Sequence, residues 1–91
     1  MISRTNADFR RDFALLPLSV QKQARAAYRL FKADPRHPSL RFKRLSPHTD
    51  LWSVRITNDY RAIARWRGEV VLWFFIGSHA DYGKLLDRLD R

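Results

Sequence analysis

The longest uninterrupted apolar stretch of the chain runs from Val70 to Ile76, between the glycines at positions 68 and 77. Seven residues are too few for an ordinary helix, and the β-branched and aromatic side chains that dominate the stretch favour a strand. Because neither face of such a strand is polar, we expect it to lie in the middle of a sheet, with both of its faces covered.

Two segments before this strand alternate between apolar and polar residues, which is the pattern of a strand with one buried face. They span residues 51–57 and 60–66, and Asn58-Asp59 between them is predicted to form a two-residue hairpin turn, since both residues tolerate positive φ. Arg67-Gly68 is predicted to form a second tight turn, into the apolar strand. The pattern indicates an antiparallel meander of three strands, or of four if residues 40–45 are also extended.

Helical periodicity dominates the first third of the chain. Residues 5–8, Thr-Asn-Ala-Asp, have the form of a capping box that opens a helix, and Pro17 is tolerated at the first position of a second helix over residues 17–33. We expect these helices to form an antiparallel hairpin, and residues 1–4 to add a short edge strand. The second helix carries one apolar stripe: Val20, Ala24, Ala27, Tyr28 and Phe31.

A third helix is predicted after the apolar strand. Ser78 and Asp81 form a second capping box, and helices that flank a run of strands indicate an α+β domain. We therefore predict one domain, residues 1–91, with an N-terminal helical hairpin packed on a three- to five-stranded, mainly antiparallel sheet and a short C-terminal helix. The apolar residues of that last helix are Tyr82, Leu85, Leu86 and Leu89.

Positive charge is concentrated in the first half of the chain. The sequence carries 18 Lys and Arg against 9 Asp and Glu, and residues 1–45 hold eleven of the basic and three of the acidic side chains. So basic a surface on a small domain favours a polyanionic partner, above all a nucleic acid, or an acidic protein. The chain has no cysteine, no apparent signal peptide and no apolar stretch long enough to cross a bilayer, so a cytoplasmic location is expected.

The strand alternation predicts where part of this charge gathers. If the helical hairpin covers the face with the tryptophan at position 52, the alternate residues project from the opposite face of the sheet. A simpler interpretation is a set of solvated side chains paired with nearby carboxylates, and exposed pairs of that kind contribute little stability. The cations predicted on this face are Arg55, Arg61 and Arg65, joined by Arg41 and Lys43 if the aromatic side chain between those two is buried.

His79 is the one histidine predicted to lie where a buried strand meets the start of a helix. Histidine has an unperturbed pKa of about 6.5, which suits proton transfer near neutral pH, although a lone histidine is more often structural than catalytic. The hydroxyl of Tyr82 can reach the cation-bearing face, whereas Asp81 is accounted for by the helix cap. His37 has no second His or Cys at metal-ligand spacing, so no metal site is predicted.

Three segments together resemble the RelE/ParE superfamily of bacterial type II toxins, most closely its HigB-like and YafQ-like members. They are LP…VQKQARAAYRLFKADPRHPSLRFKRL, WSVRITNDYRAI and WFFIGSHADYGKLL, in this order over nearly the whole chain. Their order and spacing carry the resemblance, since no one segment is as specific as a metal or phosphate-loop motif. The resemblance implies two helices packed on an antiparallel sheet, in agreement with the pattern above.

The resemblance also implies an activity. Many members of the superfamily are ribosome-dependent mRNA endonucleases that need neither a metal nor another cofactor and are inactive while bound to a cognate antitoxin. By this resemblance Arg61 is a transition-state cation, and His79 and Tyr82 transfer protons or orient the RNA. The expected partners are mRNA, the ribosome and an acidic antitoxin, without a membrane. The remaining cations would hold RNA phosphates: Arg41, Lys43, Arg44, Arg55 and Arg65.

Two alternatives remain open. Members related to ParE act on DNA gyrase and lack a nuclease site, so the first alternative is a gyrase inhibitor with the same fold. The second is a non-catalytic basic module that binds nucleic acid or an acidic protein, and its binding would depend strongly on salt without any turnover.

Overall fold

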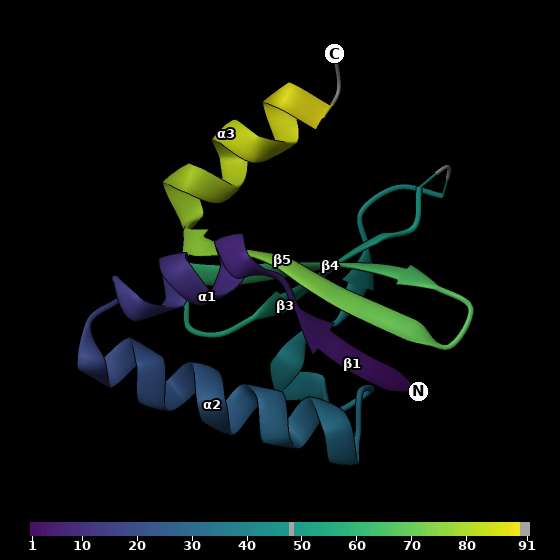
Figure 1. Ribbon diagram of the computed structural model, residues 1–91, viewed down its shortest axis with the longest axis horizontal. Helices are drawn as coiled ribbons and strands as arrows, with labels where there is room; N and C mark the ends of the chain where they lie inside the picture. The colour runs from purple at the N-terminus through teal and green to yellow at the C-terminus, as the bar shows by residue number, and fades with distance from the viewer. Residues whose placement is uncertain (48, 90–91) are drawn as a thin grey trace.

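The computed structural model describes residues 1–47 and 49–89, in which a short strand and two helices precede a run of strands and a last helix (Figure 1). The helices lie where the periodicity predicts them, and the α+β class is confirmed. In chain order the elements are β1 (Ile2–Thr5), α1 (Ala7–Ala14), α2 (Leu18–Ala33), the 3-10 turn η1 (Pro38–Leu40), β2 (Lys43–Arg44), β3 (Leu51–Arg55), β4 (Tyr60–Arg67), β5 (Val70–Ser78) and α3 (His79–Leu89).

β5 is a central strand of the sheet, as its apolar sequence predicts. The strands lie in the order β1-β5-β4-β3-β2, so β5 is hydrogen-bonded to a neighbour on each side. β3, β4 and β5 form the expected antiparallel meander, while β1 pairs with β5 in parallel, with Ile2 opposite Val70. The sheet is therefore mainly antiparallel, with one parallel strand at its edge.

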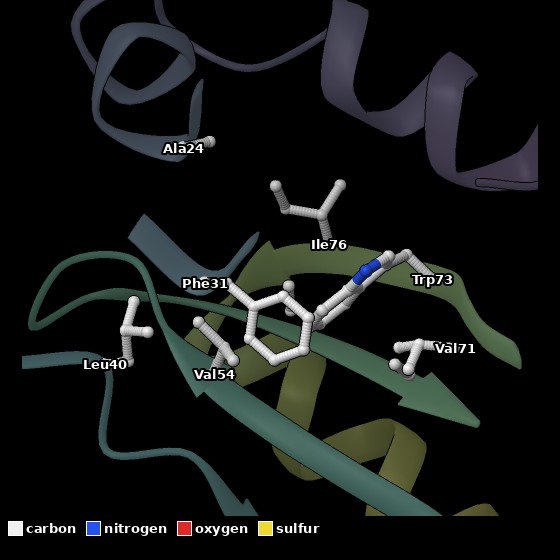
Figure 2. Close-up of a cluster of buried hydrophobic side chains, with 9 residues drawn as sticks. Ala24, Phe31, Leu40, Val54, Val71, Trp73 and Ile76 are labelled. Carbon is white, nitrogen blue, oxygen red and sulfur yellow. The ribbon is translucent and has the colours of Figure 1, made fainter. Parts of the chain in front are cut away.

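Helices α1 and α2 cover one face of the sheet, and Phe31 of α2 lies at the centre of the contact (Figure 2). Phe31 is 1% exposed. Its ring meets the ring of Trp73 on β5 edge-on, with 5.1 Å between the centroids. Ala24, seven positions earlier on the same stripe of α2, is also buried. The apolar stripe predicted over residues 17–33 is therefore the face through which α2 packs.

The hydroxyl of Ser3 ties β1 to this core. It accepts one hydrogen bond from the Tyr28 hydroxyl on α2, at 2.8 Å, and another from the indole N–H of Trp73 on β5, at 3.0 Å. Ser3 thereby supplies a partner for two polar atoms that would otherwise be left unpaired beside the core, where an unpaired polar group is costly. The short edge strand is held by side chains as well as by its backbone pairing.

Helix α3 leaves the end of β5 and extends away from α1 and α2 (Figure 1). It packs against β4 and β5, and Tyr82 in its first turn is 9% exposed. Tyr82 is therefore a packing residue, as the apolar spacing predicts. The side chain of Leu89 lies outside the described part of the chain.

The strand predicted over residues 40–45 is wrong in its extent. Lys43–Arg44 alone pairs with β3, because Leu40 ends the 3-10 turn and Arg41 takes a left-handed conformation, with φ of 45°. Leu40 is 1% exposed. The turn delivers this side chain to the core, and burial of an apolar side chain outweighs the local preference for an extended chain.

The turn between β3 and β4 is longer than predicted. The ladder closes with Arg55 opposite Arg61, which leaves residues 56–59 as the connection, and the predicted turn residues have no positive φ. The guanidinium of Arg61 explains the difference, because it donates hydrogen bonds to the carbonyl oxygens of Thr57 and Tyr60. The Arg61 side chain thus satisfies carbonyl oxygens of the connection, and a tight two-residue turn is not needed.

The turn between β4 and β5 is shifted by one residue. Arg67 pairs with Val70, so the connection is Gly68-Glu69 and not Arg67-Gly68. Gly68 has φ of +58°, a conformation that glycine adopts without the steric cost that other residues meet.

The N-terminal caps follow the expected chemistry with one change of residue. Asn6 caps α1 in place of Thr5, which is still part of β1, and the Asn6 side-chain oxygen accepts the N–H of Phe9 at 2.8 Å. At α3 the predicted cap is found, since the hydroxyl of Ser78 accepts the N–H of Asp81 at 3.1 Å.

We expect Phe31→Ala to lower the free energy of unfolding by about 3–5 kcal/mol, because it removes the ring that packs α2 against the sheet. Arg29→Ala, at an exposed position of the same helix, should change it by less than about 0.5 kcal/mol. Urea denaturation followed by circular dichroism measures both values. Equal destabilisation by the two substitutions would contradict the central place of Phe31 in the core.

Candidate functional site

Backbone pairing fixes which side chains share the face of the sheet opposite α1 and α2, since residues paired directly across two strands point to the same face. Val54 and Ala62 are paired and belong to the core beneath the helices. The next pair along these strands, Arg55 and Arg61, therefore points to the opposite side. We call that surface the cationic face, and the basic residues that the register places on it are Arg4, Lys43, Arg55, Arg61, Arg65 and Arg67.

The predicted cations divide into two groups. Arg55, Arg61 and Arg65 lie on the cationic face, where the alternation places them, and Lys43 joins them through its pairing with Ser53. Arg4 was not among the candidates. It reaches this face because β1 pairs with β5 in parallel, and no local pattern of residues 1–4 reveals that pairing.

Arg41 and Arg44 lie off the cationic face. Arg44 is paired with Trp52, so it points to the side that the helices cover, and its Nε donates a hydrogen bond of 2.6 Å to the carbonyl oxygen of Thr49. Arg41 is exposed and follows the 3-10 turn, outside the ladder. Strand alternation separates Arg44 from the other candidates, and the short extent of β2 separates Arg41.

Arg55 and Arg61 form a like-charge pair directly across two strands. Like charges in this position are destabilising unless water or an anion lies between them. One guanidinium nitrogen of Arg61 donates hydrogen bonds to the turn carbonyls. Arg55 is half-buried and makes no hydrogen bond or ion pair with any described residue. The pair therefore offers unused N–H donors to an anion at this end of the cationic face.

His79 is held at the same end of the sheet. Its backbone N–H donates a 2.6 Å hydrogen bond to the carbonyl oxygen of Asp59, in the turn between β3 and β4. Its exposed imidazole stacks on the ring of Tyr82, with centroids 5.9 Å apart and an interplanar angle of 28°. Neither the imidazole nor the Tyr82 hydroxyl has a hydrogen-bond partner among residues 1–47 and 49–89.

Gly77 allows the strand and the helix to meet here. It is paired with Arg61 on β4, and a Cβ atom at this position would lie 3.0 Å from the ring of Phe75 and 3.4 Å from the Cβ of Asp81. A side chain at this position would crowd the ring of Phe75 and would fill the space against Asp81 in the first turn of α3. Glycine therefore allows α3 to begin close to the strand that pairs with Arg61.

Asp50 neutralises the other end of the cationic face. Its carboxylate forms ion pairs with Arg67 and, at 3.8 Å, with Arg65. The hydrogen bond from Arg67 lowers the pKa of Asp50 below its ordinary value of 3.8, with a smaller contribution from the charge of Arg65. Arg55 and Arg61 therefore lie at the end of the face whose cations have no ion pair among the described residues.

Metal ligands do not gather in the described residues, where no three His, Asp or Glu side chains lie close enough together to hold an ion. Within the same residues, no helix has both the length and the apolar character to cross a membrane.

The arrangement of helices and sheet is that of known bacterial and archaeal toxins. The YoeB/ParE toxin from Agrobacterium tumefaciens superposes with a TM-score of 0.71 at 18% identity, over 87% of this chain and 99% of that one. YafQ from E. coli gives 0.71 at 13% identity, over 88% and 94% of the two chains. RelE in the RelB–RelE antitoxin–toxin complex from Methanococcus jannaschii gives 0.73 at 11% identity, over 89% and 95%.

Sequence comparison identifies the family. The family model of the ParE-like toxin domain matches residues 18–84, which include α2, the β3–β5 meander and the start of α3. The chain belongs to the ParE-like toxin family, within the RelE/ParE superfamily of type II toxin–antitoxin toxins. A search of curated protein sequences gives no significant match.

The pKa of Asp50 leads to a prediction about acid stability. A carboxyl group whose pKa is lower in the folded than in the unfolded chain stabilises the fold above its unfolded pKa, and this stabilisation is lost as the pH falls through the folded pKa. We expect the free energy of unfolding of Asp50→Asn to depend less on pH than that of the unsubstituted protein between about pH 5 and pH 2.

Urea denaturation at a series of pH values measures this difference. Asp87→Asn removes an exposed carboxylate of α3 without an ion pair among the described residues, and it should retain the pH dependence of the unsubstituted protein. Identical pH profiles for Asp50→Asn and Asp87→Asn would contradict the stabilising role of the Asp50 ion pairs.

Proposed function

We propose that the protein is a toxin that cleaves mRNA on the ribosome, without a metal ion or another cofactor. One observation carries the proposal: a cross-strand pair of arginines lies at the end of the sheet where α3 begins with an exposed histidine. Membership of the toxin family supports the biological role. Action on mRNA during translation would place the protein in the cytoplasm.

Metal-free cleavage of RNA needs a base, an acid and stabilisation of negative charge. The base removes the proton of a 2′-hydroxyl, and the freed oxygen attacks the adjacent phosphorus. The bond to the 5′-oxygen breaks, and the acid protonates that oxygen, which leaves a 2′,3′-cyclic phosphate and a 5′-hydroxyl. Positioned cations stabilise the extra charge on the phosphoryl oxygens, a contribution that is usually large.

The candidate site can supply each of these parts. Arg55, whose donors have no partner among the described residues, and Arg61, fixed against the turn, would neutralise the reacting phosphate. His79 is exposed and can exchange a proton with the substrate, and the stacked ring of Tyr82 would hold the imidazole in place. The Tyr82 hydroxyl, which has no partner among the described residues, would donate to the RNA.

The remaining cations would bind the RNA backbone on either side of the cut. Lys43 and Arg65 share the cationic face with the arginine pair, so they suit the phosphates of flanking nucleotides. Arg41 and Arg44 lie beside that face and would contact only RNA that extends past β2.

A cognate antitoxin is the proposed inhibitor. RelE of Methanococcus jannaschii shares this fold, and its structure was solved in complex with the antitoxin RelB. The unneutralised cations at the Arg55 end of the cationic face suit an acidic segment of such a partner, because opposite potentials favour association. A segment seated there would also cover His79.

The family model favours a second candidate function. Because the matching model is that of ParE-like toxins, the protein could inhibit DNA gyrase in place of cutting RNA. The cationic face would then bind its target without any proton transfer by His79.

We expect the protein to cut a reporter mRNA in a reconstituted translation reaction, at positions that primer extension maps, and only while ribosomes translate. His79→Gln should slow cleavage by about 100-fold, because it removes the proton-transfer group. Arg55→Gln should slow it by a similar factor, about 100-fold, because it removes a cation from the reacting phosphate. Both variants should keep the circular dichroism spectrum of the unsubstituted protein.

Two further variants make this experiment specific. Arg29→Gln removes one positive charge at an exposed position of α2 and should cleave at the original rate. Arg61→Ala should lower both the cleavage rate and the stability, since its guanidinium also closes the β3–β4 turn. Cuts on free RNA would support a nuclease activity that does not require the ribosome. A folded protein that makes no cuts but blocks supercoiling by gyrase would overturn the proposal in favour of the second candidate.

A further inference from the structure

A pocket lies away from the arginine pair, between the loop before β2 and the adjoining ends of β3 and β4. It encloses about 320 Å³, which falls within the range of small-molecule sites, roughly 300–1,000 Å³. Its walls combine aromatic rings with groups of both charges: Phe42, Trp52, Trp66, Arg36, Arg44 and Asp50.

The pocket is remote from the candidate catalytic site on two counts. Trp52 is paired with Ala64, a residue of the core beneath the helices, so the pocket opens on the side of the sheet that faces α1 and α2. Trp66 lies five residues beyond Arg61 on β4, and five residues of strand span about 17 Å. A ligand in this pocket would therefore contact neither Arg61 nor His79.

The aromatic residues form a partly exposed cluster, in which the ring of Trp66 is tilted by 40° to that of Phe42 and by 54° to that of Trp52. The rings of Phe42 and Trp52 are stacked, with centroids 4.6 Å apart and an interplanar angle of 17°. The ring of Trp66 lies 5.7 Å from that of Trp52 and 5.8 Å from that of Phe42. All three side chains are only half-buried. Such a cluster suits a planar ligand, since any nucleobase can stack on an aromatic side chain.

Hydrogen-bond donors are available around these rings. The indole N–H of Trp66 is taken by the carbonyl oxygen of Gly68, at 2.9 Å, but the indole N–H of Trp52 has no partner among the described residues. The exposed guanidinium of Arg36 is likewise unpaired within them. Within the described residues Arg44 donates only through its Nε, to Thr49, so its terminal nitrogens remain able to bind a phosphate.

We propose that this pocket binds a nucleobase together with its adjoining phosphate, as a single-stranded RNA presents them. The base stacks on the Phe42–Trp52 pair, and the phosphate is bound by Arg36 and Arg44. An acidic peptide would use the arginines but not the stacked rings, so the combination favours a nucleotide. The inference stands on the pocket itself and does not depend on cleavage. If the protein does cut RNA, the pocket would hold the strand far from the reacting phosphate.

Asp50 limits the kind of contact that is possible at the pocket wall. Its carboxylate would repel a phosphate, but Arg65 and Arg67 on the neighbouring strand neutralise it. A carboxylate held in this way can accept a hydrogen bond from an amino group of a base or from a ribose hydroxyl. The acidic wall therefore favours the base end of a nucleotide, and the arginines favour its phosphate.

The three tryptophans of the chain provide a direct test by NMR of their indole N–H signals. A single-stranded RNA with 2′-O-methyl groups serves as the probe, because it cannot be cut by attack of a 2′-hydroxyl. The signals of Trp52 and Trp66, assigned with Trp52→Phe and Trp66→Phe, should shift on titration. The signal of Trp73 should not, because its N–H is bonded to Ser3 beside the core.

Charge-matched variants separate this pocket from diffuse attraction to a basic protein. Arg36→Gln with Arg44→Gln should weaken binding of the probe by about tenfold, since both phosphate contacts are lost. Lys22→Gln with Arg29→Gln removes the same charge from exposed positions of α2 and should weaken it much less. Equal weakening by the two pairs would overturn the proposal.

Smaller probes identify the source of the nucleotide. Adenosine 5′-monophosphate carries both base and phosphate, whereas adenosine and inorganic phosphate each carry one of them. If the Trp52 and Trp66 signals shift with RNA but not with the monophosphate, the ligand is an RNA strand. Equal affinity for the monophosphate would overturn the proposal of an RNA strand in favour of a free nucleotide. If neither RNA nor the monophosphate moves these signals, no nucleotide binds there. Because the RNA probe is not cleaved, this failure is distinct from a failure of the proposed catalysis.

Discussion

The register of β4 between β3 and β5 is the constraint on which the rest of the structure depends. One pairing row joins Val54 to Ala62 beneath the helices, and the next row joins Arg55 to Arg61 and Arg61 to Gly77. A slip of one residue would exchange the two faces and bury the arginines. The same register sets the buried side of the sheet, the position of the charges and the place where α3 begins.

The two faces of the sheet differ in the charge that they carry. The face beneath the helices is stabilised by burial of rings such as Phe31 and Trp73, which needs close packing and no charge. The opposite face holds like charges close together, and only the Asp50 end of it is neutralised within the described chain. Burial therefore stabilises both faces, since Ile63 on the opposite face is also fully buried, but only that opposite face presents paired strand cations that can bind a ligand with negative charge.

The sequence predicts the fold well because its hydrophobic periods are long and unmixed. The stripe that contains Phe31 and the apolar run that begins at Val70 each decide an element without help from distant residues. The same alternation places Arg55 and Arg61 on one face. Local sequence patterns do not predict the structure where a single contact decides it. Leu40 is buried in the core and ends a 3-10 turn, and in the β3–β4 connection the Arg61 side chain hydrogen-bonds the backbone.

The candidate site was predicted less completely than the fold. The position of His79 between β5 and α3 is predicted because a buried strand and a helix start can both be recognised locally, but the place of Arg4 depends on the pairing of β1 with β5, which are far apart in the sequence. The aromatic pocket was not found either, since Trp52 and Trp66 read as ordinary core residues in an alternating strand. Their rings are nevertheless only half-buried, and the strand beside Trp52 is just two residues long.

The parallel pairing of β1 with β5 also bears on how the molecule is made. Ser3 bonds to Trp73 across 70 residues of sequence, so the edge of the sheet cannot form until β5 has been synthesised. The pairing of Arg61 with Gly77 is subject to the same delay. The helices form from local contacts and can precede it, because contacts between distant residues close late. A nascent chain can therefore form helical turns before its sheet is complete, and the charged face is assembled only after β5 has been synthesised.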